Sequence, residues 1–122
     1  MTRRLLTSEE RQFIDSNRVA RLATADRNGE PHAVPICFVV IKGSLYVTID
    51  RKPKDVDVNR LKRLRNIAEN PAAAVIVDRY NDDWTELGWV MLRGCAEIIG
   101  TGEEHAMAQS ALADRYPQYR NM

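Results

Sequence analysis

Apolar and polar residues alternate most regularly over residues 19–49, and this stretch predicts three consecutive antiparallel strands. In the first strand, Ala20, Leu22 and Thr24 fall on one side and the residues between them on the other. Residues 26–30 contain an Asn-Gly pair, which tolerates the positive φ of a tight hairpin, and therefore predict the first turn. We expect the other elements of the chain to pack around this meander.

The second strand, residues 32–41, is almost entirely apolar, as expected when both faces of a strand are covered. Pro35 lies inside it and cannot donate a hydrogen bond to a sheet, which indicates an edge, a bulge or an interruption of pairing. Backbone groups freed by an interruption can bind a planar, hydrogen-bonding ligand, although an edge proline without a ligand explains Pro35 equally well. Lys42 and Gly43 then turn the chain into a third strand at residues 45–49.

Helix and strand patterns also predict the elements outside the meander. In chain order they are a helix at 6–17, a loop at 50–57, a helix at 59–70, strands at 72–77 and 88–99, and a helix at 103–116. Thr7 and Glu10 have the spacing of a capping box at the start of the first helix, and Thr101 and Glu104 have it at the start of the last. Pro71 ends the middle helix.

The chain has 122 residues, of which 44% are hydrophobic, and this size fits one domain with a modest core. Its net charge of +1 indicates no particular partner, but the charges are unevenly distributed. Seven of the eighteen Lys and Arg residues lie within residues 51–65, which predicts either a phosphate site or a solvated helix face. Charge alone favours the solvated face by about two to one. No aromatic residues are interleaved with this basic cluster, which argues against a nucleic-acid partner.

Cys37 and Cys95 each stand alone inside an expected strand, and we interpret them as buried free thiols in a reducing cytosol. A disulfide between them would require the two strands to be neighbours, and no Cys-x-x-Cys pair is present to bind zinc. The first residues contain too few apolar positions for a signal peptide, and no apolar run is long enough to span a membrane. We therefore expect a cytoplasmic protein without a membrane partner.

Side chains for acid–base, nucleophilic or metal-assisted catalysis are not gathered in any motif of the sequence. His32 and His105 lack a partner at metal-ligand spacing, and glycine-rich phosphate loops and serine-nucleophile motifs are absent. We therefore expect no catalytic side chain and no metal. If the protein is an enzyme, a bound cofactor supplies the reactive group.

Short segments in a fixed order carry a family resemblance over nearly the whole chain. They are residues 21–24, 28–32, 34–36, 45–49, 52–54, 61–67, 70–71, 82–84 and 89–90, with Asp78, Tyr80, Leu87 and Gly94. This ordered set resembles the pyridoxamine 5'-phosphate oxidase-like family of FMN-binding split β-barrels. More narrowly, it is similar to the flavin/deazaflavin (F420)-dependent oxidoreductases.

The resemblance implies a mainly β fold with flanking helices, a six-stranded antiparallel split β-barrel, in a single domain over residues 1–122. It further implies a homodimer with two cofactor sites at the dimer interface, and hydride transfer to or from a small-molecule substrate. The cofactor phosphate would bind after the third strand and on the next helix, the ring would lie on the second and third strands, and a tryptophan would approach from the partner subunit. The matching residues are Val34, Pro35, Ile36, Thr48, Lys52, Lys54, Arg63, Arg65, Asn66 and Trp84.

The chain departs from the family pattern at its end, because relatives usually continue past Tyr116 and Pro117 into a further strand. We therefore expect the domain to lack that C-terminal strand.

Several functions fit these observations. An F420-dependent oxidoreductase comes first, since the long acidic tail of this cofactor favours an extended basic surface. An FMN-dependent oxidase or reductase, a non-catalytic flavin- or deazaflavin-binding protein, and a structural dimer with a solvated basic helix are the alternatives.

Overall fold

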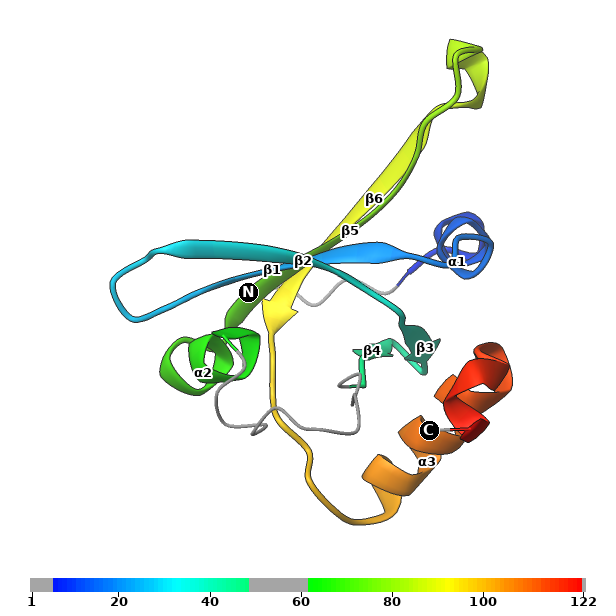
Figure 1. Cartoon of the computed structure of the whole chain (residues 1–122). Helices are drawn as coiled ribbons and strands as arrows, with labels where there is room; N and C mark the ends of the chain where they lie inside the picture. The colour runs from blue at the N-terminus through cyan, green and yellow to red at the C-terminus, as the bar shows by residue number, and fades with distance from the viewer. Residues whose placement is uncertain (1–5, 49–61, 122) are drawn as a thin grey trace.

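A computed structural model describes residues 6–48 and 62–121 of the chain. Over these residues the architecture is mainly β with three α-helices (Figure 1). The elements are α1 (Ser8–Asp15), β1 (Ala20–Ala25), β2 (Pro31–Ile36), β3 (Val39–Ile41), β4 (Ser44–Tyr46), α2 (Lys62–Glu69), β5 (Ala72–Arg79), η2 (Trp84–Glu86), β6 (Gly88–Cys95), α3 (Glu103–Arg115) and η3 (Pro117–Asn121). One antiparallel sheet has the strand order β2-β1-β5-β6, and β3 pairs with β4 in the other.

β1 alternates between buried and exposed residues, as its sequence predicts, because one face of the four-stranded sheet packs on the core. Ala20, Leu22 and Thr24 are buried, whereas Arg21 and Ala23 between them are exposed. The core joins this inner face to α1, to the segment after β2 and to β3. Its buried hydrophobic residues are Ile14, Ala20, Leu22, Ile36, Phe38, Val40, Val75 and Val77.

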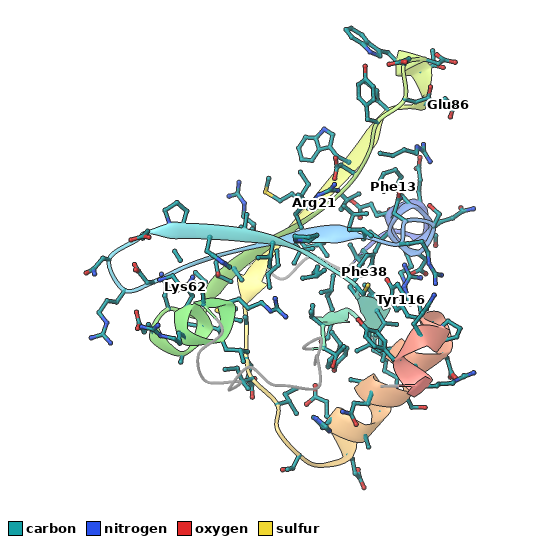
Figure 2. All side chains as sticks on the ribbon, viewed as in Figure 1. Phe13, Arg21, Phe38, Lys62, Glu86 and Tyr116 are labelled. Atoms are coloured by element: carbon teal, nitrogen blue, oxygen red, sulfur yellow. The ribbon has the colours of Figure 1, made fainter. Side chains whose placement is uncertain are left out.

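The expected second strand, residues 32–41, is divided between the two sheets, so the prediction of one continuous strand is wrong. β2 pairs with β1 as far as Ile36, and the chain then joins β4 from Val39 onward. The division falls at Phe38, whose side chain is fully buried and whose N–H donates to the Tyr116 hydroxyl at 3.1 Å. Figure 2 shows Phe38 and Tyr116 side by side between β3 and α3. Pro35 is not at the break, since it stays in register opposite Arg21.

The six strands of the described residues lie in two separate sheets, so the structure does not show the expected split β-barrel as one six-stranded barrel. No ladder joins the β3–β4 sheet to the four-stranded sheet within residues 6–48 and 62–121. β4 ends at Tyr46, so Val47 and Thr48 continue without strand pairing, and β6 ends at Cys95 rather than near residue 99. The antiparallel pairing and the order of the elements nevertheless agree with the predicted mainly β fold.

The first and last helices begin differently. At α1, the capping box is confirmed: the Thr7 hydroxyl accepts from the Glu10 N–H at 3.1 Å, and the Glu10 carboxylate accepts from the Thr7 N–H at 2.9 Å. At α3, the predicted capping box is absent, because Gly102 occupies the N-cap with a φ of 102° and no side chain caps the helix. A left-handed φ of this kind favours glycine, so the N-cap is Gly102 rather than Thr101, and the helix begins at Glu103 as predicted.

Both cysteines are free thiols, but they differ in exposure. Cys37 is half-buried and Cys95 is exposed near the end of β6. The expectation of two buried thiols is therefore wrong for Cys95, whose neighbours Arg93 and Gly94 are also exposed. None of the described helices is long and apolar enough to cross a membrane.

Candidate cofactor-binding site

α2 carries the C-terminal part of the basic cluster and lies beside the β1–β2 hairpin near its turn (Figure 1). Arg63 is half-buried and Arg65 is exposed, and neither forms an ion pair with a residue that the structure describes. Lys62 differs, since its Nζ lies 3.6 Å from Asp26 Oδ2. Because they are two positions apart, Arg63 and Arg65 point to different sides of α2, and each guanidinium could make a bidentate contact with a phosphate. Lys52 and Lys54, the other predicted phosphate ligands, lie outside the described residues.

Asn66 was predicted to contact the cofactor. In the structure its side chain lies on the face of α2 that packs against β1. It is 1% exposed, and its Nδ2 donates to Thr24 Oγ1 at 3.1 Å. Its Oδ1 has no hydrogen-bond partner among the described residues, and neither does Nδ1 of His32, which stands opposite Thr24 on β2. Buried polar atoms are normally paired, so this corner of the inner face has hydrogen-bonding capacity for one more polar group, such as water.

The predicted ring contacts Val34, Pro35 and Ile36 do not share a face of β2. Ile36 is buried in the core and Val34 packs against it, whereas Pro35 is exposed on the outer face. Pro31, Ala33 and Pro35 are exposed, so the described residues cover only one face of β2. Within the described residues β2 is an edge strand, so alternate N–H and C=O groups point away from β1. A flat ligand would therefore meet the edge of β2 rather than a common surface of these side chains.

Thr48 and Trp84, the remaining predicted cofactor contacts, belong to parts of the chain other than α2. Thr48 is half-buried and follows β4 without strand pairing. Trp84 lies in η2, at the far end of the long β5–β6 hairpin, where Figure 2 labels the neighbouring Glu86. Its indole is 73% exposed and its Nε1 lies 3.4 Å from the Tyr80 hydroxyl. One chain therefore does not bring Trp84 to the helix that carries Arg63 and Arg65.

Large apolar side chains are exposed along this hairpin and on the adjoining outer face of the sheet. On β6, Trp89 is 66% exposed and Met91 is 41% exposed, while the alternate residues Val90 and Leu92 pack against the core. The exposed large hydrophobic residues of the hairpin are Tyr80, Trp84, Leu87, Trp89 and Met91. A cluster of this kind on a small domain marks an interaction surface.

The β1–β2 turn beside α2 is strongly hydrogen-bonded and negatively charged. Asp26 Oδ1 accepts from the N–H groups of Asn28 and Glu30, both at 2.9 Å. The Glu30 N–H above all, with Asn28 and Lys62, lowers the pKa of Asp26 below its usual value. The pKa of Glu69 is likewise lowered, chiefly by the Arg27 N–H. These carboxylates stay ionised and pair with Lys62 and Arg27, and neither pairs with Arg63 or Arg65.

Two surface hollows of the described chain lie elsewhere and contain none of the predicted site residues. The larger, about 760 Å³, runs between α1 and the turn at Gly43, and the smaller, about 560 Å³, lies between α1, β3 and α3. Arg11 lines both, but its guanidinium already contacts Asp15 at 2.9 Å and the Val40 carbonyl at 2.7 Å. These hollows therefore offer fewer free donors than α2 does.

A flat, phosphate-bearing cofactor fits the described residues in three respects. Arg63 and Arg65 can neutralise the phosphate, the free edge of β2 can bond the ring, and the unpaired atoms of His32 and Asn66 can take a further polar group. Among these residues no cluster of three His, Cys, Asp or Glu side chains could hold a metal ion.

Sequence reasoning missed the residues that hold this arrangement together, notably Thr24, Asp26 and Tyr116. An Asp two residues before Asn and four before Glu in a turn is a local signal that could have identified Asp26. Thr24 and Tyr116 act through partners 42 and 78 residues away, so no local pattern reveals them.

The fold and this site together define a class of antiparallel β-sheet proteins with a basic helix beside an open strand edge. Residues 6–121 match the family model described as pyridoxamine 5'-phosphate oxidase, and the chain belongs to that family.

A relative in Streptomyces rimosus is a 5a,11a-dehydrotetracycline/5a,11a-dehydrooxytetracycline reductase. It is 30% identical over 99 residues, which cover 79% of this chain and 66% of the relative, so the chain spans just under two thirds of that protein.

Solved structures with a similar fold include proteins with different ligands in their names. A heme storage protein from Vibrio cholerae superposes with a TM-score of 0.73 at 17% identity, covering 94% of this chain and 78% of that one. An FAD-binding protein from Mycobacterium smegmatis superposes with a TM-score of 0.64 at 22% identity, covering 88% and 80%. At these identities the likeness shows the fold alone.

Proposed function

We propose that this protein is an oxidoreductase that transfers a hydride between coenzyme F420 and a small organic substrate. The observation that carries this proposal is the position of Arg63 and Arg65, neither of which forms an ion pair with a described residue, on a helix beside the inner face of the sheet in a member of this family. The relative that is a reductase supports the reaction type, and the FAD-binding neighbour supports a flat redox cofactor.

In this proposal the residues of the chain bind and orient, and the cofactor supplies hydride chemistry when it is bound. Arg63 and Arg65, with Lys52 and Lys54, hold the phosphate, and the edge of β2 around Pro35 orients the ring. Trp84 comes from the second subunit of a homodimer, since its own chain carries it away from α2. No side chain of this chain serves as an essential general acid or base, so orientation is the main contribution of the protein.

FMN is the alternative cofactor, because it offers the same phosphate and a similar tricyclic ring to the same residues. A protein that binds either cofactor without turnover is the further alternative, and it is compatible with the lack of acid–base side chains. The extended basic cluster favours F420, whose longer tail carries more negative charge than the single phosphate of FMN.

Cofactor titration tests the proposal. Purified full-length protein is titrated with F420, FMN and riboflavin, and binding is followed by fluorescence at low and at physiological ionic strength. We expect F420 to bind more tightly than FMN, and riboflavin to bind weakly. The affinities of F420 and FMN should both fall at the higher ionic strength, because salt screens the charge of the arginines. Reduced F420 is then tested as a hydride donor to small enone and quinone acceptors.

Each outcome has a distinct meaning. Equal affinity for FMN and riboflavin would exclude the phosphate site. Tighter binding of FMN than of F420 would select the alternative cofactor. Binding of F420 without oxidation of its reduced form by any acceptor would favour the non-catalytic binding protein. A protein isolated with heme, visible in its absorbance spectrum, would contradict all three.

A further inference from the structure

α2 is attached to the β1–β2 hairpin by one polar face rather than by its apolar side. The contacting positions 62, 66, 69 and 70 follow the spacing that places residues on one side of a helix. The contacts are Lys62 Nζ to Asp26 Oδ2 (3.6 Å), Asn66 Nδ2 to Thr24 Oγ1 (3.1 Å), Arg27 N to Glu69 Oε1 (3.1 Å) and Asn70 Nδ2 to the Asp26 carbonyl (3.4 Å). The apolar residues Leu64 and Ile67 are half-buried and lie outside the core cluster.

Among these contacts, the hydrogen bond between Asn66 and Thr24 is the buried one. Asn66 is 1% exposed and Thr24 is 5% exposed. The side chain of Lys62 is 38% exposed, and exposed ion pairs hold a helix weakly because water and salt screen them. A buried donor or acceptor is costly to leave unpaired, so the position of α2 depends more on this hydrogen bond than on the exposed contacts.

The rotation of α2 about its axis also decides where its guanidinium groups point. Arg63 lies three positions before Asn66 and Arg65 directly precedes it, so the two arginines lie on opposite flanks of Asn66. A helix pinned at Asn66 therefore fixes the direction in which each side chain leaves the helix. Neither arginine is itself held by an ion pair with the described residues. Their orientation therefore depends on the helix that carries them.

We propose that Thr24 and Asn66 form a positioning pair: by fixing the rotation of α2 they orient Arg63 and Arg65, on its two flanks, for contact with the cofactor phosphate, which the pair itself does not touch. This inference rests on the proposed function and assigns Asn66 a different role from the direct contact that the sequence predicts. Thr24 becomes a functional residue although it lies on β1, on the inner face of the sheet. The pair thus determines affinity for the phosphate and leaves recognition of the ring unchanged.

The test compares two ligands that differ in the phosphate alone, FMN and riboflavin, on full-length protein. Thr24→Val removes the acceptor and keeps the shape of the side chain, and Thr24→Ser is the matched control that keeps the hydroxyl. We expect Thr24→Val to raise the dissociation constant of FMN about tenfold and that of riboflavin by less than about twofold, because charge-assisted phosphate contacts depend on geometry. Thr24→Ser should keep the wild-type ratio of the two dissociation constants.

A Thr24→Val protein with the wild-type ratio of FMN to riboflavin affinity would overturn the positioning role and leave the phosphate site intact. Equal loss of both ligands, with no recovery in Thr24→Ser, would also overturn it, because the residue would then be only structural. A wild-type protein that binds the two ligands equally well would exclude the phosphate site of the proposed function, and with it the positioning pair. Circular dichroism checks the fold of each variant. Should Thr24→Val not fold, Thr24→Ala replaces it, with the same loss expected.

Discussion

Asp26 stabilises the β1–β2 turn through its side chain and also faces the helix that carries the candidate phosphate ligands. Its Oδ1 accepts two backbone N–H groups, and its Oδ2 lies near the Lys62 ammonium. These donors lower the pKa of Asp26, so the carboxylate contributes stability above the ordinary carboxyl pKa of about 4. That contribution is lost as the pH falls through the lowered pKa of the folded protein.

Asp26→Asn should therefore destabilise the protein most at neutral pH and progressively less in acid, where the wild-type carboxylate is protonated as well. The measurement is the urea midpoint of both proteins between pH 7 and about pH 2.5. Asp82→Asn, in the exposed loop before η2, is the control and should show little difference at any pH. A gap between wild type and Asp26→Asn that does not change with pH would show that charge is not the cause.

Arg65 is the residue through which the proposed phosphate contact is most directly tested, because its side chain is exposed and its loss leaves no buried group unpaired. Arg65→Ala should raise the dissociation constant of F420 or FMN about tenfold or more, since hydrogen bonds to charged groups contribute roughly 1.5–3 kcal/mol. The thermal midpoint should stay close to that of wild type. The readout is the dissociation constant at two salt concentrations.

Arg120→Ala is the matched control for this change, because it removes the same charge from η3, where Arg120 pairs with Asp114 at 2.6 Å. It should leave cofactor affinity nearly unchanged. If the two variants bind the cofactor equally well, Arg65 has no specific role. The contact with Lys54, which the sequence predicts, can be examined in the same assay with Lys54→Ala.

At the scale of elements, the break between β2 and β3 is the feature that reshapes the predicted meander. The Tyr116 hydroxyl accepts from the Phe38 N–H and from Arg115 Nε at 3.0 Å, and the Arg18 carbonyl lies 2.9 Å from it as an acceptor. The guanidinium of Arg18 also stacks over the Tyr116 ring at 4.7 Å. One hydroxyl from the end of α3 therefore joins the strand break to the start of β1.

Tyr116→Phe should lower the free energy of unfolding by about 1–3 kcal/mol, because it leaves the buried Phe38 N–H without an acceptor. Chemical denaturation measures this loss. Tyr80→Phe removes a hydroxyl from a residue that is 69% exposed and should change stability by less than about 0.5 kcal/mol. Equal effects of the two substitutions would rule out the proposed role of the Tyr116 hydroxyl.

The elements also show which parts of the structure the sequence can predict. The capping box of α1 and the alternation in β1 depend on residues within one turn or one strand, and both predictions are confirmed. The strand break depends on Tyr116, 78 residues from Phe38, and a pattern of apolar residues cannot reveal it. The contacts of the polar side of α2 with β1 and its turn likewise join residues that are far apart in the sequence. Residues 49–61, which include Lys52 and Lys54, lie outside the described residues, so their predicted contacts stay predictions.

At the scale of the whole molecule, the outer face of the four-stranded sheet lacks a covering layer within the described chain. One row across its strands contains Met91, Ile76, Arg21 and Pro35. In a neighbouring row, Trp89 pairs with Asp78. Together with the aromatic tip of the hairpin, this row presents apolar surface around the Arg21–Asp78 ion pair. A specific dimer typically covers roughly 800 Å² on each partner, so a hairpin and a sheet face can supply an interface.

We therefore expect a homodimer at micromolar concentration, and Met91→Lys should dissociate it because a lysine in the apolar row would be buried without a counter-ion. Sedimentation velocity measures the change, and Gln109→Lys, on an exposed position of α3, controls for the added charge. If Trp84 completes the site of the other subunit, the monomer formed by Met91→Lys should also lose cofactor affinity, although Arg63 and Arg65 are unchanged. A wild-type monomer would contradict the dimer. Unchanged affinity in a monomeric Met91→Lys protein would show instead that each chain binds the cofactor alone.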